Sequence, residues 1–339
     1  MVQIKKLDLA LQGGGSHGAY TWGVIDRLLA DDRIEIEGIS GTSAGAMNGV
    51  VMADALTRGD KETARKALSD FWHAVSRAGM TSPIRRSPLD VLTGNWSLDH
   101  SPGYIAMDLM SRLVSPYQFN PLNINPLRDI VAEHVNFERV RGCEQLKLFV
   151  AATNVRTGKQ RVFRREEMSI DAVMASACLP FVFQAVEIEG DAYWDGGYMG
   201  NPALFPLMEE CTARDIMLVQ INPVSRDDVP TSASAIMNRL NEITFNASLI
   251  KEIRMIALLK HVFEEQGIEN NYQQALFHRI SGEQALENLS VSSKMNAEWP
   301  FLCHLFEQGR DAADRWLAEH FEALGNYSSL DIDAVYLHE

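Results

Sequence analysis

Two glycine-framed segments near the start of the chain most constrain what this sequence can fold into. The sequence GGGSHG spans residues 13–18 and GTSAG spans residues 41–45, and each lies where a predicted strand gives way to a predicted helix. The second segment has the form G-x-S-x-G, in which a serine sits on a turn so sharp that its side chain projects from the top of a sheet. The flanking Gly41 and Gly45 tolerate crowding that a Cβ could not. Ser43 is therefore the first candidate for a catalytic nucleophile.

The first glycine segment can supply another part of such a site. Ester cleavage needs hydrogen-bond donors where the carbonyl oxygen becomes an anion, and one such donor contributes on the order of 3 kcal/mol. We predict that the backbone N–H groups of Gly13, Gly14 and Gly15 form this oxyanion hole, helped by the dipole of the following helix. The spacing Gly13-x-Gly15-x-x-Gly18 also fits a dinucleotide-binding fingerprint. The acidic residue that this fingerprint requires is ambiguous here, and the second strand ends in the serine turn instead, which favours hydrolysis.

A serine nucleophile also needs a base that takes its proton. Histidine is the usual base, but none of the nine histidines stands in an evident catalytic context. His17 better suits capping a helix or lining a pocket, and His304 better suits packing in a late apolar stretch. A carboxylate can serve where it contacts the serine and water is partly excluded. Asp195, in the tripeptide Asp195-Gly196-Gly197, is the candidate, although this tripeptide taken alone is a common turn.

Predicted strands and helices alternate over the first two thirds of the chain. Two strand-turn-helix units come first, at residues 7–29 and 34–56, and a helix follows at 61–77. The segment 81–125 is rich in Ser, Pro, Gly and Asn, which predicts a loop or lid. The further predicted elements are a helix at 125–135, hairpins at 146–163 and 186–194, a short helix at 169–177 and a strand at 215–222.

The last third of the chain has a different pattern. From about residue 236 it is predicted to be helical throughout, with helices at 238–266, 284–289 and 299–324. Alternating elements followed by accumulating helices predict an α/β fold, a three-layer α/β/α core with a helical C-terminal part. We accordingly divide the chain into a catalytic domain at 1–235 and a helical extension at 236–339 that packs on it.

Four separated motifs match one protein family in order and spacing. They are GGGxxG at 13–18, GTSAG at 41–45, ASACLP at 175–180 followed by Phe183, and DGG at 195–197 with Asn201-Pro202. With these motifs the chain resembles the patatin-like phospholipases over about residues 5 to 222. The resemblance implies a serine and aspartate dyad without histidine, on a three-layer α/β/α sheet, that cleaves acyl esters of lipids.

The resemblance also implies a role for each matching position. Ser43 would be the nucleophile, Asp195 its base, and the amides of Gly13 to Gly15 the oxyanion hole. The glycines that support these turns are Gly18, Gly41, Gly45, Gly196 and Gly197. His17 departs from the pattern, because many bacterial members of the family have arginine there. No cofactor or metal is expected, since serine chemistry requires none and the His and acidic residues are not grouped at ligand spacings.

Two alternatives remain open. The first is a conventional hydrolase triad with a late histidine such as His304, although such folds usually have several strands before the serine turn and Ser43 follows only the second. The second is a lipid-binding or scaffolding protein that kept the fold and lost its activity. The presence of Ser43, Asp195 and the motif glycines weighs against this second alternative.

The charge of the chain limits its partners. A formal net charge of -14 and a sequence pI near 5.1 argue against nucleic acid, which needs a basic stripe. The same charge weakens adsorption to anionic membranes, so any transient contact with a membrane surface must be local and hydrophobic. The amphipathic stretch 248–263 could make such a contact, although packing on the core or on another subunit is favoured.

The expected location is cytoplasmic, with a peripheral contact at a membrane left open. The four cysteines stand alone without a CxxC pair, which is typical of free thiols in a reducing compartment. The N-terminal residues have no apolar stretch of signal-peptide length, and no run approaches the roughly 20 apolar residues of a membrane span.

Overall fold

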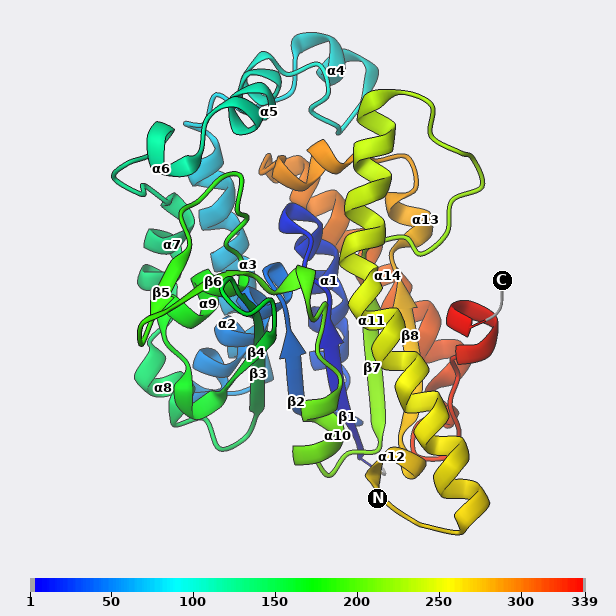
Figure 1. Cartoon of the computed structure of the whole chain (residues 1–339). Helices are drawn as coiled ribbons and strands as arrows, with labels where there is room; N and C mark the ends of the chain where they lie inside the picture. Colours follow the sequence, from blue (N-terminus) through cyan, green and yellow to red (C-terminus); the bar gives the residue numbers. More distant parts are fainter. Residues whose placement is uncertain (1–3, 338–339) are drawn as a thin grey trace.

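The computed structural model describes residues 4–337, and its centre is an eight-stranded mixed sheet (Figure 1). Neighbouring strands are parallel in the order β3-β2-β1-β7-β8, whereas β6 and β5 continue the sheet beyond β3 in antiparallel pairs and β4 also pairs with β3. The strands are β1 (Lys5–Leu11), β2 (Ile34–Gly41), β3 (Lys147–Asn154), β4 (Gln160–Arg164), β5 (Val186–Ile188), β6 (Asp191–Asp195), β7 (Asp215–Gln220) and β8 (Leu276–Ser281).

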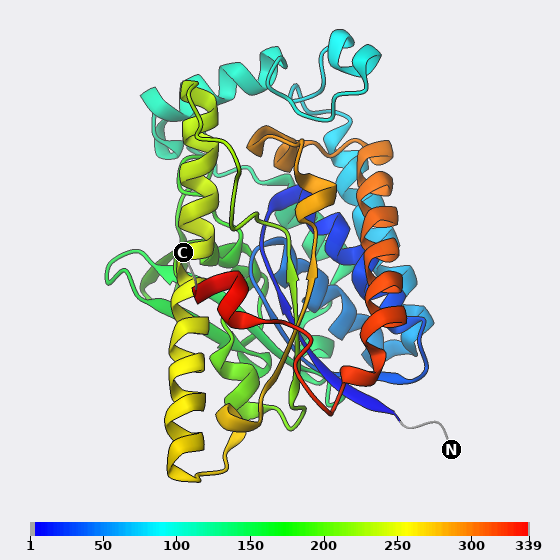
Figure 2. The same ribbon diagram turned by 90° about the vertical axis from the view of Figure 1, so that its right-hand side faces the viewer.

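The sheet is covered on both faces. Leu7, Leu9 and Leu11 of β1 belong to one hydrophobic cluster and Ala10 to another, as the alternation of a buried parallel strand requires. The first face is covered by α1 (Gly18–Leu29), α2 (Ala44–Arg58), α3 (Lys61–Gly79) and α14 (Trp299–His320), and the second by α10 (Phe205–Glu210), α11 (Ala233–Gln266) and α12 (Asn271–Gln274). The view in Figure 2 shows α11 and α14 on opposite sides of the sheet, so the predicted three-layer α/β/α fold is confirmed.

Long α11 contains the stretch 248–263. Its side chains Leu249, Ile253 and Ile256 are buried in the second cluster, so this part of the helix packs on the core, as the sequence favoured. The shorter helices α7 (Pro126–His134), α8 (Phe137–Arg141) and α9 (Ile170–Ser176) add to the first face. Within residues 4–337, no helix is both long and apolar enough to cross a membrane.

The segment predicted as a loop or lid contains three helices instead of irregular chain. They are α4 (Pro88–Thr93), α5 (Pro102–Leu113) and α6 (Pro116–Phe119), which lie together at one end of the molecule (Figure 1). Each begins with a Ser-Pro pair, in which the serine stands at the N-cap and the proline at the first helical position. Both residues favour a helix start at these positions, so the loop prediction was wrong because it read them only as helix breakers.

The C-terminal third is not helical throughout, which corrects the prediction for that region. Residues 276–281 form β8, which pairs in parallel with β7 and extends the same sheet. Phe277, His278 and Ile280 are buried there, so tertiary packing stabilises a strand within a mostly helical region. Two short helices follow β8, α13 (Glu283–Leu286) and the 3-10 helix η4 (Val291–Met295). The division of the chain near residue 235 stays a prediction.

Candidate active site

The two glycine-framed segments lie side by side at the carboxyl ends of β1 and β2. These strands are parallel neighbours with Leu11 paired to Gly41, so the turns that follow them leave the sheet at the same edge. Gly13 packs directly against the serine turn. A Cβ on Gly13 would lie 2.7 Å from the Ser43 Cβ and 2.9 Å from the Thr42 carbonyl oxygen. The absence of a side chain at Gly13 therefore lets the loop backbone approach the serine.

Ser43 has the strained backbone expected for the predicted nucleophile turn. Its φ is 52°, a left-handed value that is uncommon for a residue with a side chain, and α2 begins at the next residue. The Ser43 N–H donates a hydrogen bond to Ser176 Oγ at 2.9 Å, which holds the turn in this shape. A Cβ on Gly41 would lie 2.7 Å from the backbone of Gly45, so the tight turn also depends on its first glycine.

Asp195 reaches the same region from β6, which lies on the side of β2 that faces away from β1. It ends β6, where it pairs with Ala152 of β3, and β3 is the neighbour of the strand that leads into the serine turn. The Asp195 N–H donates to the Cys178 carbonyl oxygen at 2.8 Å. The turn after Asp195 packs on the serine turn, because Thr42 Oγ1 donates to the Gly200 carbonyl oxygen at 2.6 Å. The motif residues at 175–180 thus hold both the serine turn and Asp195.

The Asp195 carboxyl is buried and only weakly compensated. Burial raises its pKa from 3.8 to about 7. The Gly197 N–H, which donates to Asp195 Oδ1 at 2.7 Å, the Ser43 side chain and the charge of Lys294 each lower this pKa, but less than burial raises it. Asp195 is 1% exposed and Ser43 9% exposed, so the serine is the more accessible of the two. A carboxyl with a pKa near 7 can both accept and return a proton at neutral pH.

The glycine loop is held by two asparagines, and this changes the oxyanion prediction. The Gly13 N–H donates to Asn201 Oδ1 at 2.6 Å, so this amide is already occupied. The Gly13 carbonyl oxygen accepts from Asn222 Nδ2 at 2.8 Å. Gly13 was predicted as a donor to the oxyanion, and in this structure its N–H is already bonded to Asn201, so its role stays a prediction that would require this bond to be exchanged. The amides of Gly14 and Gly15 stay candidates.

The sequence did not predict three polar residues around this loop as site residues. Asn201 belongs to one of the family motifs, and Asn222 ends a predicted strand, but neither was predicted as a site residue. Because Asn222 lies at the carboxyl end of a buried strand, that position could have indicated a site residue. Lys294, whose Nζ donates to Asn222 Oδ1 at 2.7 Å, belongs to η4 and carries no sequence signal.

The two histidines considered as bases have other partners. His17 Nε2 is hydrogen-bonded to Ser293 Oγ at 2.7 Å, and its ring packs edge-on against Phe301. Burial lowers the pKa of His17 to about 3, so this ring is neutral at physiological pH. His304 stacks on Trp96, with ring centroids 6.0 Å apart.

A serine, a histidine and an aspartate do meet, but at the opposite end of the strands. His278 Nε2 lies 2.9 Å from Asp215 Oδ1, and its Nδ1 lies 2.9 Å from Ser329 Oγ. Asp215 pairs with Leu7, four residues before Leu11, which places this group about 13 Å along the strands from the serine turn. The His278 ring is fully buried, so the group ties the C-terminal tail to the sheet.

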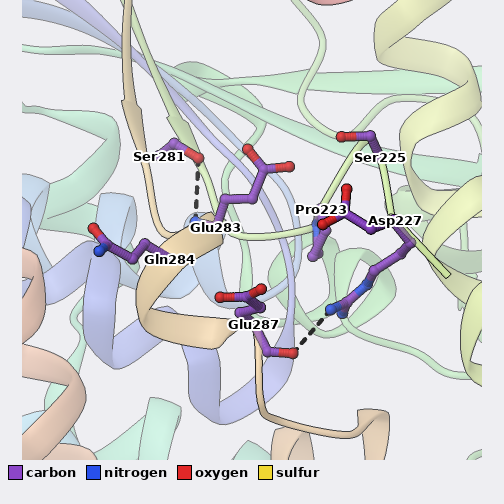
Figure 3. A pocket seen from close by; sticks show the side chains of 8 residues that line it. Pro223, Ser225, Asp227, Ser281, Glu283, Gln284 and Glu287 are labelled. Atoms are coloured by element: carbon purple, nitrogen blue, oxygen red, sulfur yellow. Dashed lines mark hydrogen bonds between the residues drawn. The ribbon is translucent and has the colours of Figure 1, made fainter.

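A pocket of about 470 Å³ begins at Pro223, the residue after Asn222, and contains none of the predicted site residues (Figure 3). It is formed by the segments that follow β7 and β8, and its lining residues include Pro223, Asp227, Glu283 and Glu287. In the close-up, the Glu283 N–H donates to Ser281 Oγ. Among residues 4–337, no cluster of three His, Cys, Asp or Glu side chains could hold a metal ion.

Comparison with known proteins assigns the chain to a family. A family model described as patatin-like phospholipase matches residues 9–208, which include both glycine-framed segments and Asp195. The chain belongs to the patatin-like phospholipase family. Lipid hydrolysis is accordingly the class of function that the family supports. A search of curated proteins gave no significant match.

Two solved structures illustrate how distant the structural relatives are. VipD from Legionella pneumophila has 16% sequence identity and a TM-score of 0.45, and the match covers 94% of this chain and 67% of VipD. The type III effector protein ExoU has 14% identity and a TM-score of 0.37, and the match covers 93% of this chain. The patatin-like chain spans only 53% of that ExoU chain. ExoU from Pseudomonas aeruginosa also has a solved complex with SpcU.

Proposed function

We propose that this protein is a serine acyl hydrolase, a phospholipase A or lipid esterase that cleaves acyl esters of lipids through a Ser43–Asp195 dyad. The observation that carries the proposal is the junction of three parts at one edge of the sheet. Ser43 sits on a turn with positive φ, a buried carboxyl with a pKa of about 7 interacts with it, and a glycine loop packs against its Cβ. These are the nucleophile, base and oxyanion loop that acyl transfer requires.

The proposed reaction has two halves. Asp195 takes the hydroxyl proton as Ser43 Oγ attacks the acyl carbonyl carbon, and the N–H groups of Gly14 and Gly15 stabilise the oxyanion. The tetrahedral intermediate then expels the alcohol part of the lipid, which receives the proton from Asp195, and an acyl-enzyme remains on Ser43. Water attacks this ester with Asp195 again as the base, releasing the fatty acid and restoring the serine.

Two isosteric or near-isosteric substitutions test the dyad. Ser43→Ala and Asp195→Asn should each lower kcat for a soluble short-chain nitrophenyl ester by at least about 10³-fold, because one removes the nucleophile and the other the base. Thermal unfolding should show that both variants remain folded. Wild-type rates in Ser43→Ala would refute the nucleophile, and wild-type rates in Asp195→Asn would direct attention back to a histidine.

The alternative of a retired lipid-binding or scaffolding protein makes the opposite prediction for the wild type. A folded wild-type protein that hydrolyses neither the nitrophenyl ester nor phospholipid in vesicles or mixed micelles would favour this alternative. The strained serine turn argues against it, because a left-handed backbone at Ser43 costs stability that a binding protein has no reason to retain.

We also propose that the protein is cytoplasmic and contacts a lipid bilayer peripherally through α5 and the start of α11. α5 has no buried residue, yet it carries exposed apolar side chains at helical spacing, namely Ile105, Leu109 and Leu113. The first turns of α11 expose Ile236, Leu240 and Ile243 at the same end of the molecule (Figures 1 and 2). The catalytic turns also leave the sheet at that end. The four cysteines are free thiols, which supports a reducing compartment.

A matched pair of leucines tests the bilayer contact. Leu109 is 56% exposed on α5, and Leu258 is 57% exposed on the far half of α11. Leu109→Glu should weaken cosedimentation with phosphatidylcholine vesicles about tenfold or more, because a buried apolar side chain contributes about 1.5–3 kcal/mol and a charge opposes insertion. Leu258→Glu should bind like wild type, and both should keep wild-type rates on the soluble ester. Equal vesicle binding by the two variants would contradict the contact, and concentration-dependent dimerisation lost only in Leu109→Glu would assign the surface to a second copy.

A further inference from the structure

The peptide group between Gly13 and Gly14 is held in one orientation by side chains. Asn222 Nδ2 donates to the Gly13 carbonyl oxygen at 2.8 Å. In a planar trans peptide the carbonyl and the N–H of the next residue point in opposite directions. Fixing the Gly13 oxygen therefore also fixes the direction of the Gly14 N–H, one of the two remaining candidate donors to the oxyanion.

The orientation of the Asn222 amide is itself determined by a cation. Lys294 Nζ donates to Asn222 Oδ1 at 2.7 Å, and an ammonium group can only donate. Asn222 must therefore turn its oxygen toward Lys294 and its Nδ2 toward the acceptors on the other side. These acceptors are the Gly13 carbonyl oxygen and Gln12 Oε1, the latter at 3.1 Å. A flipped amide would bring donors together at Lys294 and oxygens together at Gly13.

Lys294 lies directly behind the glycine loop. Gly15 has a φ of 58°, and a Cβ there would run into the Lys294 carbonyl oxygen and approach the Lys294 Cβ to 3.4 Å. Burial lowers the pKa of the Lys294 ammonium to about 8, while the nearby carboxyl groups of Glu242 and Asp195 act in the opposite direction. The cation thus remains mostly protonated at neutral pH, although it is partly buried.

We propose that Lys294 is a positioning residue, which acts through Asn222 to aim the Gly14 N–H at the oxyanion. The inference rests on the proposed acyl transfer and deepens it. Lys294 and Asn222 both lie outside residues 9–208, the part of the chain that matches the family model. Residues after position 208 therefore complete a site whose proposed nucleophile and base lie within the segment that matches the family model.

The test separates stabilisation of the oxyanion from ordinary substrate binding. Lys294→Met removes the donor, and Asn222→Asp keeps a partner for Lys294 but cannot donate to the Gly13 oxygen. Both should lower kcat for the soluble nitrophenyl ester about 10- to 100-fold, with KM within threefold of wild type. Inhibition by an alkyl boronic acid, which forms a tetrahedral adduct on serine, should weaken by a similar factor. Binding of a non-cleavable ether lipid should stay unchanged, and Lys294→Arg should recover part of kcat.

A second partly buried lysine provides the control. Lys260 Nζ donates to the Ala275 carbonyl oxygen at 2.6 Å, and burial lowers its pKa as well, but it lies on α11 away from the glycine loop. Lys260→Met should keep wild-type kcat and boronic acid inhibition. Should Lys294→Met fail to fold, Asn222→Asp carries the test.

Wild-type kcat in a folded Asn222→Asp would overturn the inference. So would a loss of ether-lipid binding equal to the loss of boronic acid binding, because that pattern indicates general damage to the pocket. Either result with an active wild-type enzyme leaves the proposed hydrolase intact, whereas an inactive wild type refutes the proposed function itself.

Discussion

The serine turn (residues 41–45) and the glycine loop (residues 13–15) lie against each other, yet different parts of the chain hold them. The serine turn is held by segments within 9–208, through the backbone of β1 and through Ser176 at the end of α9. The glycine loop also depends on Asn222 after β7 and on Lys294 in η4. The family segment thus shapes the serine turn, while residues beyond it help to orient the adjoining loop.

The largest contrast between the two turns should come from matched glycine substitutions. Gly45→Ala should abolish activity and lower the free energy of unfolding by about 1–3 kcal/mol or more. The new Cβ would lie against the Leu11 backbone and 2.9 Å from the Leu11 Cβ, and Leu11 cannot move because it belongs to the central strand β1. Gly13→Ala should also cost stability, though less than Gly45→Ala, because its Cβ would meet the Ser43 Cβ at 2.7 Å and the Thr42 carbonyl oxygen at 2.9 Å, and it should lower kcat about 10²-fold by displacing the loop from Ser43. Thermal unfolding and ester hydrolysis distinguish the two. Equal losses of stability would show that the loop is as rigidly packed as the serine turn.

The pH dependence of hydrolysis should report the base beside the serine turn. Asp195 accepts a proton only when ionised, so kcat/KM should fall about tenfold per pH unit below a pKa of about 7 and level off just above it. Initial rates on the soluble ester, measured from pH 5 upward over the range in which the protein stays folded, give this profile. A level profile down to pH 5 would contradict the role of Asp195.

A second buried carboxyl offers a comparison without a proposed catalytic role. Burial raises the pKa of Asp8 on β1 to about 8, and the neighbouring Glu37 adds to the shift. Because the folded-state pKa lies above the unfolded value of 3.8, this contribution to stability is full below about pH 3.8 and is lost progressively as the pH rises from there through about 8. Asp8→Asn should therefore raise the unfolding temperature at pH 9 more than at pH 5, and it should leave kcat unchanged. Greater stabilisation at pH 5 would refute this assignment.

The smallest effect is expected at His17. Its ring is neutral and hydrogen-bonded to Ser293, so His17→Gln, which keeps a polar group there, should change kcat less than about threefold. A loss of about 10²-fold with unchanged thermal stability would make the histidine part of the reaction after all.

The sequence predicted the α/β core well because its elements carry local signals. A short apolar run at 7–11 and an alternating pattern at 34–40 marked the first two strands, and glycine turns marked the junctions at residues 13–18 and 41–45. The failures have physical causes. The Ser-Pro pairs that begin α4, α5 and α6 resemble loop sequence, and β8 is a strand because of its pairing with β7, some 60 residues earlier.

The site could be predicted where a glycine motif indicates a tight turn of the backbone. Ser43 and Asp195 were candidates from their glycine-framed turns, and the fold brings them together, while their catalytic roles stay predictions. Nothing in the sequence indicated that Asn201 occupies the Gly13 N–H. Lys294 could not be predicted for the same reason. It is an isolated lysine 72 positions after Asn222, and only folding brings the two side chains into contact.

The central claim is that Ser43 is an activated nucleophile, and covalent labelling tests it most directly. The wild-type protein is treated with a fluorophosphonate and its peptides are analysed by mass spectrometry, with Ser43→Ala as the control. The account predicts one adduct per chain, located on Ser43, and none in the variant. An adduct on another serine, or a wild-type enzyme that hydrolyses ester yet remains unlabelled at Ser43, would contradict it.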